Sequence, residues 1–70
     1  MEVVAFLKQH EPGIVRVSMR SRGTFDVRAV AAGFGGGGHH NAAGCTIAGN
    51  IADAERELTA ALADALGSET

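Results

Sequence analysis

The alternating segment of residues 14–21 has the sequence Ile14-Val15-Arg16-Val17-Ser18-Met19-Arg20-Ser21. Apolar and polar side chains follow one another with a period of two, which is the pattern of a β-strand with one buried and one polar face. The apolar members point into a core, and the polar members Arg16, Ser18 and Arg20 line the opposite face. The segment therefore predicts a sheet that is covered on one side.

The segments around this strand supply further strands. Val3–Leu7 is a short apolar run, which predicts a strand buried on both faces. Between the two strands, Glu11-Pro12-Gly13 predicts a turn, because proline presets φ and glycine accepts a left-handed conformation. A third strand is expected at Gly44–Ile47, which is short and β-prone.

Two helices are expected as well. Asp26 is placed to cap a short helix that ends at Gly33, and its apolar residues at helical spacing are Val27, Val30, Ala31 and Phe34. Asn50 is placed to cap the last helix, which Gly67 ends. The apolar face of that helix consists of Ile51, Ala54, Leu58, Ala61, Leu62, Ala65 and Leu66. The order is β-β-α-β-α, so the fold class is a small α+β domain with the helices packed on one face of the sheet.

Composition narrows the class of protein. The chain has 70 residues, enough for one small domain with a thin core. It contains no tryptophan or tyrosine, and Phe34 is the aromatic residue beside the glycines. The chain therefore has few aromatic side chains on which the bases of single-stranded nucleic acid could stack. The single cysteine, Cys45, fits a reducing compartment. Without a visible signal peptide or membrane-spanning run, a cytoplasmic location and no membrane partner are expected.

The net charge of −2 conceals an uneven distribution of charge. Residues 16–41 contain four arginines and one aspartate, a local balance of +3. Residues 49–70 have a balance of −4. This pattern favours a local anion site over a surface that coats long DNA.

The segment most suggestive of binding is Gly35-Gly36-Gly37-Gly38-His39-His40-Asn41-Ala42-Ala43-Gly44. Glycine lets the backbone turn through positive φ and approach another molecule closely, and successive amides beside such a turn attract anions. Four glycines cost conformational freedom that a simple connector could avoid, which favours a binding loop. The segment lacks the Lys and Ser/Thr of a P-loop and the glycine spacing of a dinucleotide site.

Several side chains are candidates for this chemistry. Arg20 is the best candidate for holding a phosphate or carboxylate, because a guanidinium makes bidentate contacts. An imidazole is a further donor to a phosphate, and the residues alone leave open whether His39 or His40 acts. Adjacent histidines diverge and rarely share one metal ion, so no metal site is expected here. Cys45 is interpreted as a small buried residue rather than a nucleophile.

Three segments, Val17–Ser21, Asp26-Val27 and Phe34–Cys45, strongly resemble the C-terminal DHH-associated domain of the DHH phosphoesterases. The resemblance covers essentially the entire chain and is to the oligoribonuclease (nano-RNase) and phosphoadenosine phosphatase branch. Its most specific part is the Gly-Gly-Gly-His core followed by Ala-Ala-Gly. His40 stands where many relatives have lysine or arginine.

The resemblance implies a substrate-binding domain whose partners are an N-terminal DHH domain and short RNA or DNA oligonucleotides or nucleotide phosphates. The DHH domain would hold two Mn²⁺ ions and cleave the phosphoester. Because the Asp-His-His motif is absent, this chain is expected to be a fragment with no catalytic residues, no cofactor and no activity of its own. Arg20 and His39 would contact the substrate phosphate or terminal nucleotide. The full set of implied substrate-binding residues is Ser18, Arg20, Gly36, Gly37, Gly38, His39 and Asn41.

Two other functions are compatible with parts of this pattern. One is an RNA-binding DHH-associated domain of an alanyl-tRNA synthetase or tRNA-editing relative. Such a domain usually lacks the His-Asn-Ala-Ala-Gly continuation, and a tRNA binder should be more basic than −2. The other is a stand-alone regulatory domain that senses small anionic metabolites.

Overall fold

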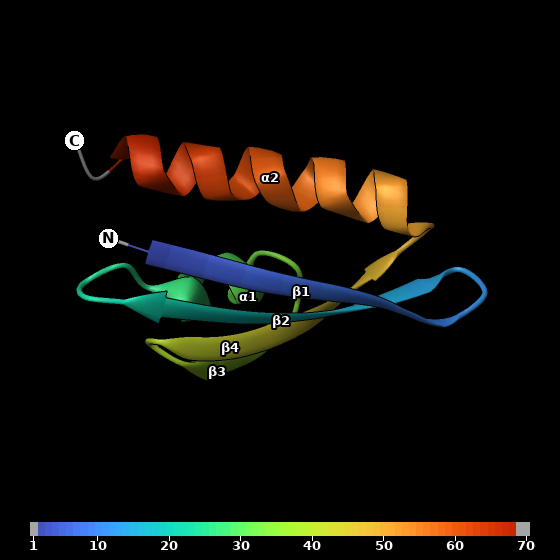
Figure 1. Ribbon diagram of the computed structural model, residues 1–70, viewed down its shortest axis with the longest axis horizontal. Coiled ribbons are helices and arrows are strands. Elements are labelled where there is room, and N and C mark those ends of the chain that lie inside the picture. Colours follow the sequence, from blue (N-terminus) through green and yellow to red (C-terminus); the bar gives the residue numbers. More distant parts are fainter. Residues whose placement is uncertain (1, 69–70) are drawn as a thin grey trace.

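A four-stranded antiparallel sheet with two helices on one of its faces forms the domain (Figure 1). The computed structural model describes residues 2–68. The strands lie in the order β1-β2-β4-β3, and each neighbouring pair is antiparallel. The element bounds are β1 Glu2–Glu11, β2 Ile14–Arg22, α1 Val27–Ala32, β3 Gly37–His39, β4 Ala42–Ala48 and α2 Ile51–Ser68. The predicted α+β class is confirmed.

Strand β2 follows its sequence pattern closely. Val15, Val17 and Met19 are buried, whereas Arg16 and its alternate neighbours on the other face are exposed. The strand lies between β1 and β4, so its apolar face is covered by the helices and its polar face is left open. The prediction of a half-buried strand here is confirmed.

Strand β1 differs from its prediction. It extends to Glu11, and its residues alternate between half-buried and exposed from Val3 to Leu7. Val4 and Phe6 are exposed, so the interpretation of a strand buried on both faces is wrong. The physical reason is that both helices cover the same face, and β1 lies at the sheet edge with its other face open.

Both helix caps are confirmed. The Asp26 side chain accepts a hydrogen bond from the N–H of Ala29 at 3.2 Å, and α1 ends at Gly33 as expected. The Asn50 side chain accepts from the N–H of Asp53 at 2.8 Å at the start of α2. Helix α2 runs one residue beyond Gly67, the expected end.

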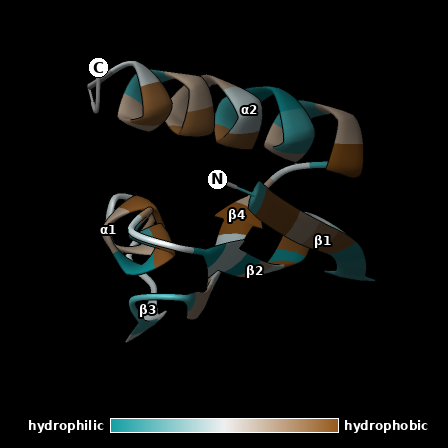
Figure 2. Ribbon diagram, turned by 60° about the vertical axis from the view of Figure 1, so that its left-hand side comes forward, coloured by the Kyte–Doolittle hydropathy of each residue, from teal (hydrophilic) through white to brown (hydrophobic). Residues whose placement is uncertain are grey.

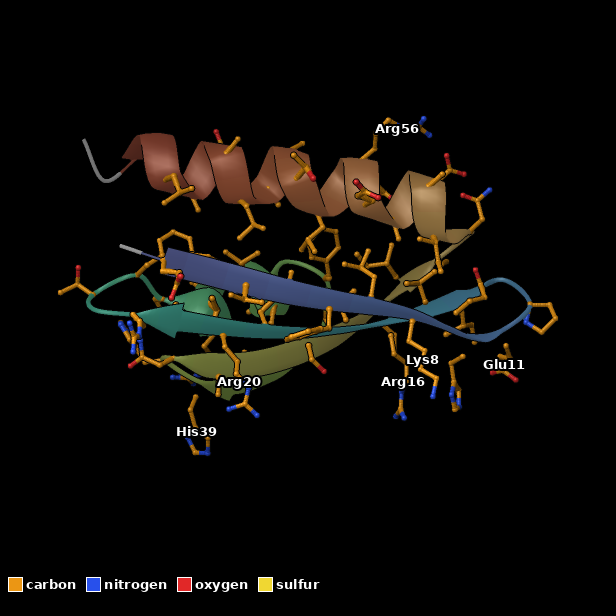
Figure 3. All side chains as sticks on the ribbon, in the orientation of Figure 1. Lys8, Glu11, Arg16, Arg20, His39 and Arg56 are labelled. Atoms are coloured by element: carbon orange, nitrogen blue, oxygen red, sulfur yellow. The ribbon has the colours of Figure 1, made fainter. Side chains whose placement is uncertain are left out.

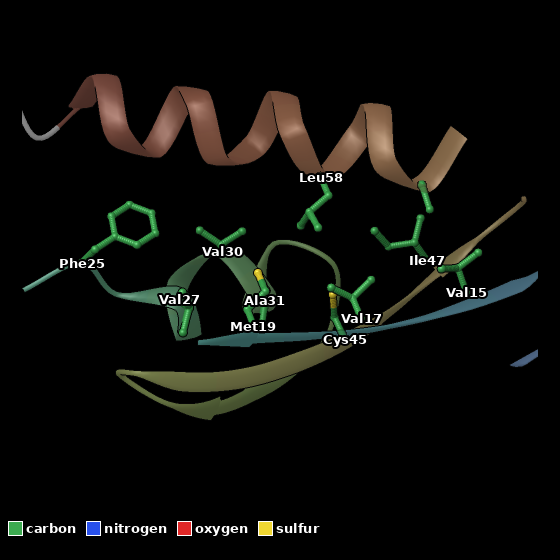
Figure 4. Packing of buried hydrophobic residues seen from close by; sticks show 11 residues of the cluster. Val15, Val17, Met19, Phe25, Val27, Val30, Ala31, Cys45, Ile47 and Leu58 are labelled. Carbon is green, nitrogen blue, oxygen red and sulfur yellow. The ribbon is translucent and has the colours of Figure 1, made fainter. Parts of the chain in front are cut away.

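The core fills the space between the helices and the sheet (Figure 4). Hydrophobic and hydrophilic residues alternate along α2, whereas β1 is hydrophobic from Val3 to Leu7 (Figure 2). Ile51 and Leu66 of the predicted apolar face of α2 remain 40% and 39% exposed, because they lie near the helix ends. The buried core residues are Val15, Val17, Met19, Phe25, Val27, Val30, Ala31, Cys45, Ile47, Ala54 and Leu58.

The glycine-rich segment contains a strand that the sequence pattern did not predict. Gly37–His39 forms β3, which pairs with the first residues of β4, and β4 itself extends from Ala42 to Ala48. The order is therefore β-β-α-β-β-α. Glycine has no side chain to alternate, so a strand made of it leaves no hydrophobic period. Among residues 2–68, no helix is long and apolar enough to cross a membrane.

Candidate functional site

The face of the sheet that the helices leave uncovered, here called the open face, gathers the basic side chains of three strands. Lys8, Arg16, Arg20 and His39 all project from it, on the side away from α2 (Figure 3). The strand register explains this convergence, because directly paired residues in a sheet share a face. The rows across the open face are Val4–Arg20–Ala42–His39, Phe6–Ser18–Gly44–Gly37 and Lys8–Arg16–Thr46.

Two of the four glycines are required by the packing of β3 against β4. A Cβ on Gly36 would lie 2.2 Å from the carbonyl oxygen of Gly44. A Cβ on Gly38, whose φ is 141°, would lie 2.7 Å from the carbonyl oxygen of Ala42. These approaches are closer than any side chain permits, so the glycine run has a structural role in addition to the expected binding role.

Gly37 is different, since a Cβ there would meet nothing within 4 Å and its φ is not positive. The fold therefore does not demand glycine at this position of the open face. The backbone amides of the glycine run, which were expected to attract an anion, are not all available for a ligand. The N–H of Gly36 donates to the carbonyl of Ala31 at 2.9 Å and is thus already used within the domain.

The two histidines have separate surroundings. His39 is exposed on the open face, in the row of Arg20. His40 turns the other way, and its Nε2 lies 2.9 Å from the carbonyl oxygen of Thr24, which can only accept a hydrogen bond. Its Nδ1 lies 3.8 Å from the Asp26 carboxylate. His40 thus stabilises the loop before α1, whereas the exposed side chain of His39 is accessible to a ligand.

Asn41 is engaged within the domain. Its Nδ2 donates to the Ser21 hydroxyl at 3.0 Å and to the carbonyl of Gly23 at 3.1 Å. The backbone carbonyl of Asn41 accepts from the N–H of Ser21, and that of His40 accepts from the N–H of Val27. These bonds fasten the turn between β3 and β4 to the segment between β2 and α1, which fixes where His39 stands.

Two shallow hollows are lined by some of the expected site residues, whereas Gly37, Gly38 and His39 line neither of these two. The larger is about 450 Å³ and lies at Arg20 and Asn41. The other is about 400 Å³ and lies at Ser18 and Gly36, with Arg16 at its margin. Among residues 2–68, no group of three or more His, Cys, Asp or Glu side chains is placed to hold a metal ion.

The family profile described as the DHHA1 domain matches residues 1–68. The chain belongs to the DHHA1 domain family. A curated relative, the bifunctional oligoribonuclease and PAP phosphatase NrnA of Thermus thermophilus, is 49% identical over 47 residues. That match covers 67% of this chain and 14% of the relative, so the chain spans a small part of the relative's length. The resemblance to a DHH-associated domain is confirmed.

One surface feature of this DHHA1 domain was missed by sequence reasoning. Phe34, expected near the site, is half-buried and packs against the core. Phe6 instead stands on the open face, 63% exposed, opposite Ser18. Every residue from Val3 to Leu7 is apolar, so the sequence contained no polar position that would have marked the open side of this strand.

The thiol of this DHHA1 domain is buried, as expected, and burial raises the pKa of Cys45 above its ordinary value of 9.0. The thiolate is the reactive form, so the folded protein has less of it at any pH up to that value. We expect iodoacetamide at about pH 8 to modify Cys45 several-fold more slowly in the folded chain than in urea, as measured by mass spectrometry. Equal rates in both states would show an accessible, ordinary thiol.

Proposed function

We propose that this domain binds short oligonucleotides or nucleotide phosphates on its open face, with Arg20 and His39 holding one phosphate. The observation that carries the proposal is their common row. Their strands are separated only by β4, so their backbones lie about 10 Å apart, with the small Ala42 between them. A phosphate above Ala42 is within reach of both side chains.

The charges around this position support an anionic ligand. Among residues 2–68, no acidic side chain pairs with Arg20 or Arg16 within 4.0 Å, whereas Arg22 lies 4.0 Å from Glu2. A guanidinium that is exposed and unpaired retains its five donors for a bidentate contact with phosphate. The open face is thus locally basic although the whole chain carries −2.

The relative supports the ligand class. Its name assigns it oligoribonuclease and PAP phosphatase activities. We infer that hydrolysis belongs to a DHH domain with its Mn²⁺ ions, and that this domain binds and orients the substrate. Gly37 and Ser18 would border the phosphate. Gly38 pairs with Ala43, which packs against the core, so it would act by letting β3 approach β4 closely. Asn41 would act by fixing the turn that carries His39.

The direct test is binding of a 5′-phosphorylated diadenylate to the ¹⁵N-labelled chain, followed by NMR. Contacts to charged groups contribute about 1.5–3 kcal/mol each, so Arg20→Ala should weaken binding about 10-fold or more, from a wild-type affinity in the high-micromolar to millimolar range. His39→Ala should weaken it by a smaller factor. Arg20→Lys should also bind poorly, because lysine retains the charge but loses the planar fork.

Arg56→Ala is the matched control. Arg56 projects from the far side of α2, where it pairs with Asp53, and its removal subtracts the same charge (Figure 3). It should leave the affinity within about twofold, since exposed charges beyond a Debye length are screened. Wild-type affinity in both Arg20→Ala and His39→Ala would refute the proposal.

A further inference from the structure

A large aromatic side chain stands unusually exposed among basic residues on the open face. Phe6 is 63% exposed, in the middle of β1. Its diagonal neighbours on β2, on either side of Ser18, are Arg16 and Arg20. Phenylalanine in this position contributes little to the core, because the core lies on the other face of the sheet.

The row that continues from Phe6 across the sheet has almost no side chains. It consists of Ser18, Gly44 and Gly37, so the surface beside the ring is a shallow floor made largely of backbone. Gly37 contributes to this floor although the fold would accept a Cβ there. Basic rows border the floor on both sides, with Arg16 and Arg20 about 13 Å apart along β2.

We propose that Phe6 is a stacking residue for a nucleobase of the bound ligand, with the base lying over the floor beside its ring. The inference rests on the proposed function, because the phosphate of the same ligand would be held by Arg20 and His39. Stacking on an aromatic ring suits any base, since every base has a π-face. The short, flat floor fits one or two nucleotides rather than a long strand.

A protein surface is a weaker fit to this face. Among residues 2–68, Phe6 and Val4 are the large apolar side chains exposed there. A stable protein interface buries about 800 Å² on each partner around an apolar centre, which two side chains do not provide. The surrounding arginines and lysine match the charge of a nucleotide backbone.

The test compares two probes that share a phosphate and differ in the base: the 5′-phosphorylated diadenylate and ribose 5-phosphate. Phe6→Ala should weaken binding of the diadenylate about 5- to 150-fold, since stacking contributes about 1–3 kcal/mol per base. The affinity of Phe6→Ala for ribose 5-phosphate should stay within about twofold of the wild-type value, because the aromatic ring does not contact the phosphate of either probe. Leu66→Ala removes an equally apolar, exposed side chain from α2 and is the matched control.

Two further variants separate stacking from general apolar contact. Phe6→Leu should lose as much diadenylate affinity as Phe6→Ala, because leucine has bulk but no π-face. Phe6→Trp should retain binding, and because the chain has no other tryptophan, its fluorescence should be quenched by the diadenylate and not by ribose 5-phosphate.

The outcomes distinguish this inference from the proposed function. Wild-type diadenylate affinity in Phe6→Ala or Phe6→Leu would overturn the role of Phe6 even if Arg20→Ala still weakens both probes. Equal loss of both probes in Phe6→Ala would also overturn it. If Arg20→Ala weakens neither probe while Phe6→Ala weakens the diadenylate, the phosphate site fails and the stacking site stands.

Discussion

Gly36→Ala is expected to destabilise the domain by about 3 kcal/mol, at the upper end of the range for an overpacked interior. The new Cβ would lie 2.2 Å from the carbonyl oxygen of Gly44 and 2.6 Å from the Cβ of Cys45. Neither is the end of a flexible side chain, so β3 must move away from β4. For a domain of this size, the melting temperature should fall by about 12 °C or more, measured by circular dichroism.

Gly37→Ala is the matched control, with the identical change one residue later. Its Cβ would meet nothing within 4 Å, and alanine is favoured over glycine inside a strand, so the melting temperature should be unchanged or slightly higher. The added methyl group would lie on the floor at the end opposite to Phe6, and diadenylate binding should weaken. A Gly36→Ala variant as stable as the Gly37→Ala variant would contradict the close packing of β3 on β4.

Phe25→Ala should destabilise the domain more than truncation of any other core side chain. Phe25 is 2% exposed and is the largest fully buried side chain among residues 2–68. It lies on the sheet side of α2, near the start of α1 (Figure 4). Replacing a buried phenylalanine by alanine costs about 3–5 kcal/mol, comparable to the whole stability of a domain this small. Chemical denaturation should therefore show little or no folded baseline.

Phe6→Ala makes the same chemical change on the open face and is the comparison for Phe25→Ala. Exposed substitutions usually change stability by less than about 0.5 kcal/mol, so its melting temperature should move by only a few degrees. If the two variants melt alike, the assignment of Phe25 to the core and of Phe6 to the surface is wrong. The same melts also establish that any lost binding in Phe6→Ala is not caused by unfolding.

The separation of charge gives the open face its character. Helix α2 contains Asp53, Glu55, Glu57 and Asp64, and it covers the face of the sheet opposite to Arg16, Arg20 and His39 (Figure 3). An acidic helix on one side and a basic sheet face on the other orient an approaching anion toward the sheet. The net charge of −2 alone would have suggested the opposite preference.

The sequence by itself determined the elements whose residues carry a local signal. The alternation in residues 14–21 specified β2 and its buried face, because a strand repeats every two residues. Asp26 and Asn50 marked the helix starts, because their side chains satisfy the first free N–H groups of a helix. The most specific part of the family resemblance was equally local, since the Gly-Gly-Gly-His core and the following Ala-Ala-Gly lie in one continuous segment.

Only the tertiary structure decided what depends on partners distant in the chain. Strand β3 exists because glycines without side chains fit against β4, and no hydrophobic period announces such a strand. His39 and His40 are equivalent in sequence, and the hydrogen bond from His40 to the Thr24 carbonyl distinguishes them. Phe6 belongs to a uniformly apolar run, and it became a surface residue because both helices cover the other face of the sheet. The exposure of a side chain depends on which elements pack against its face of the sheet. A local sequence pattern predicts that face only when polar residues occupy the side that stays exposed.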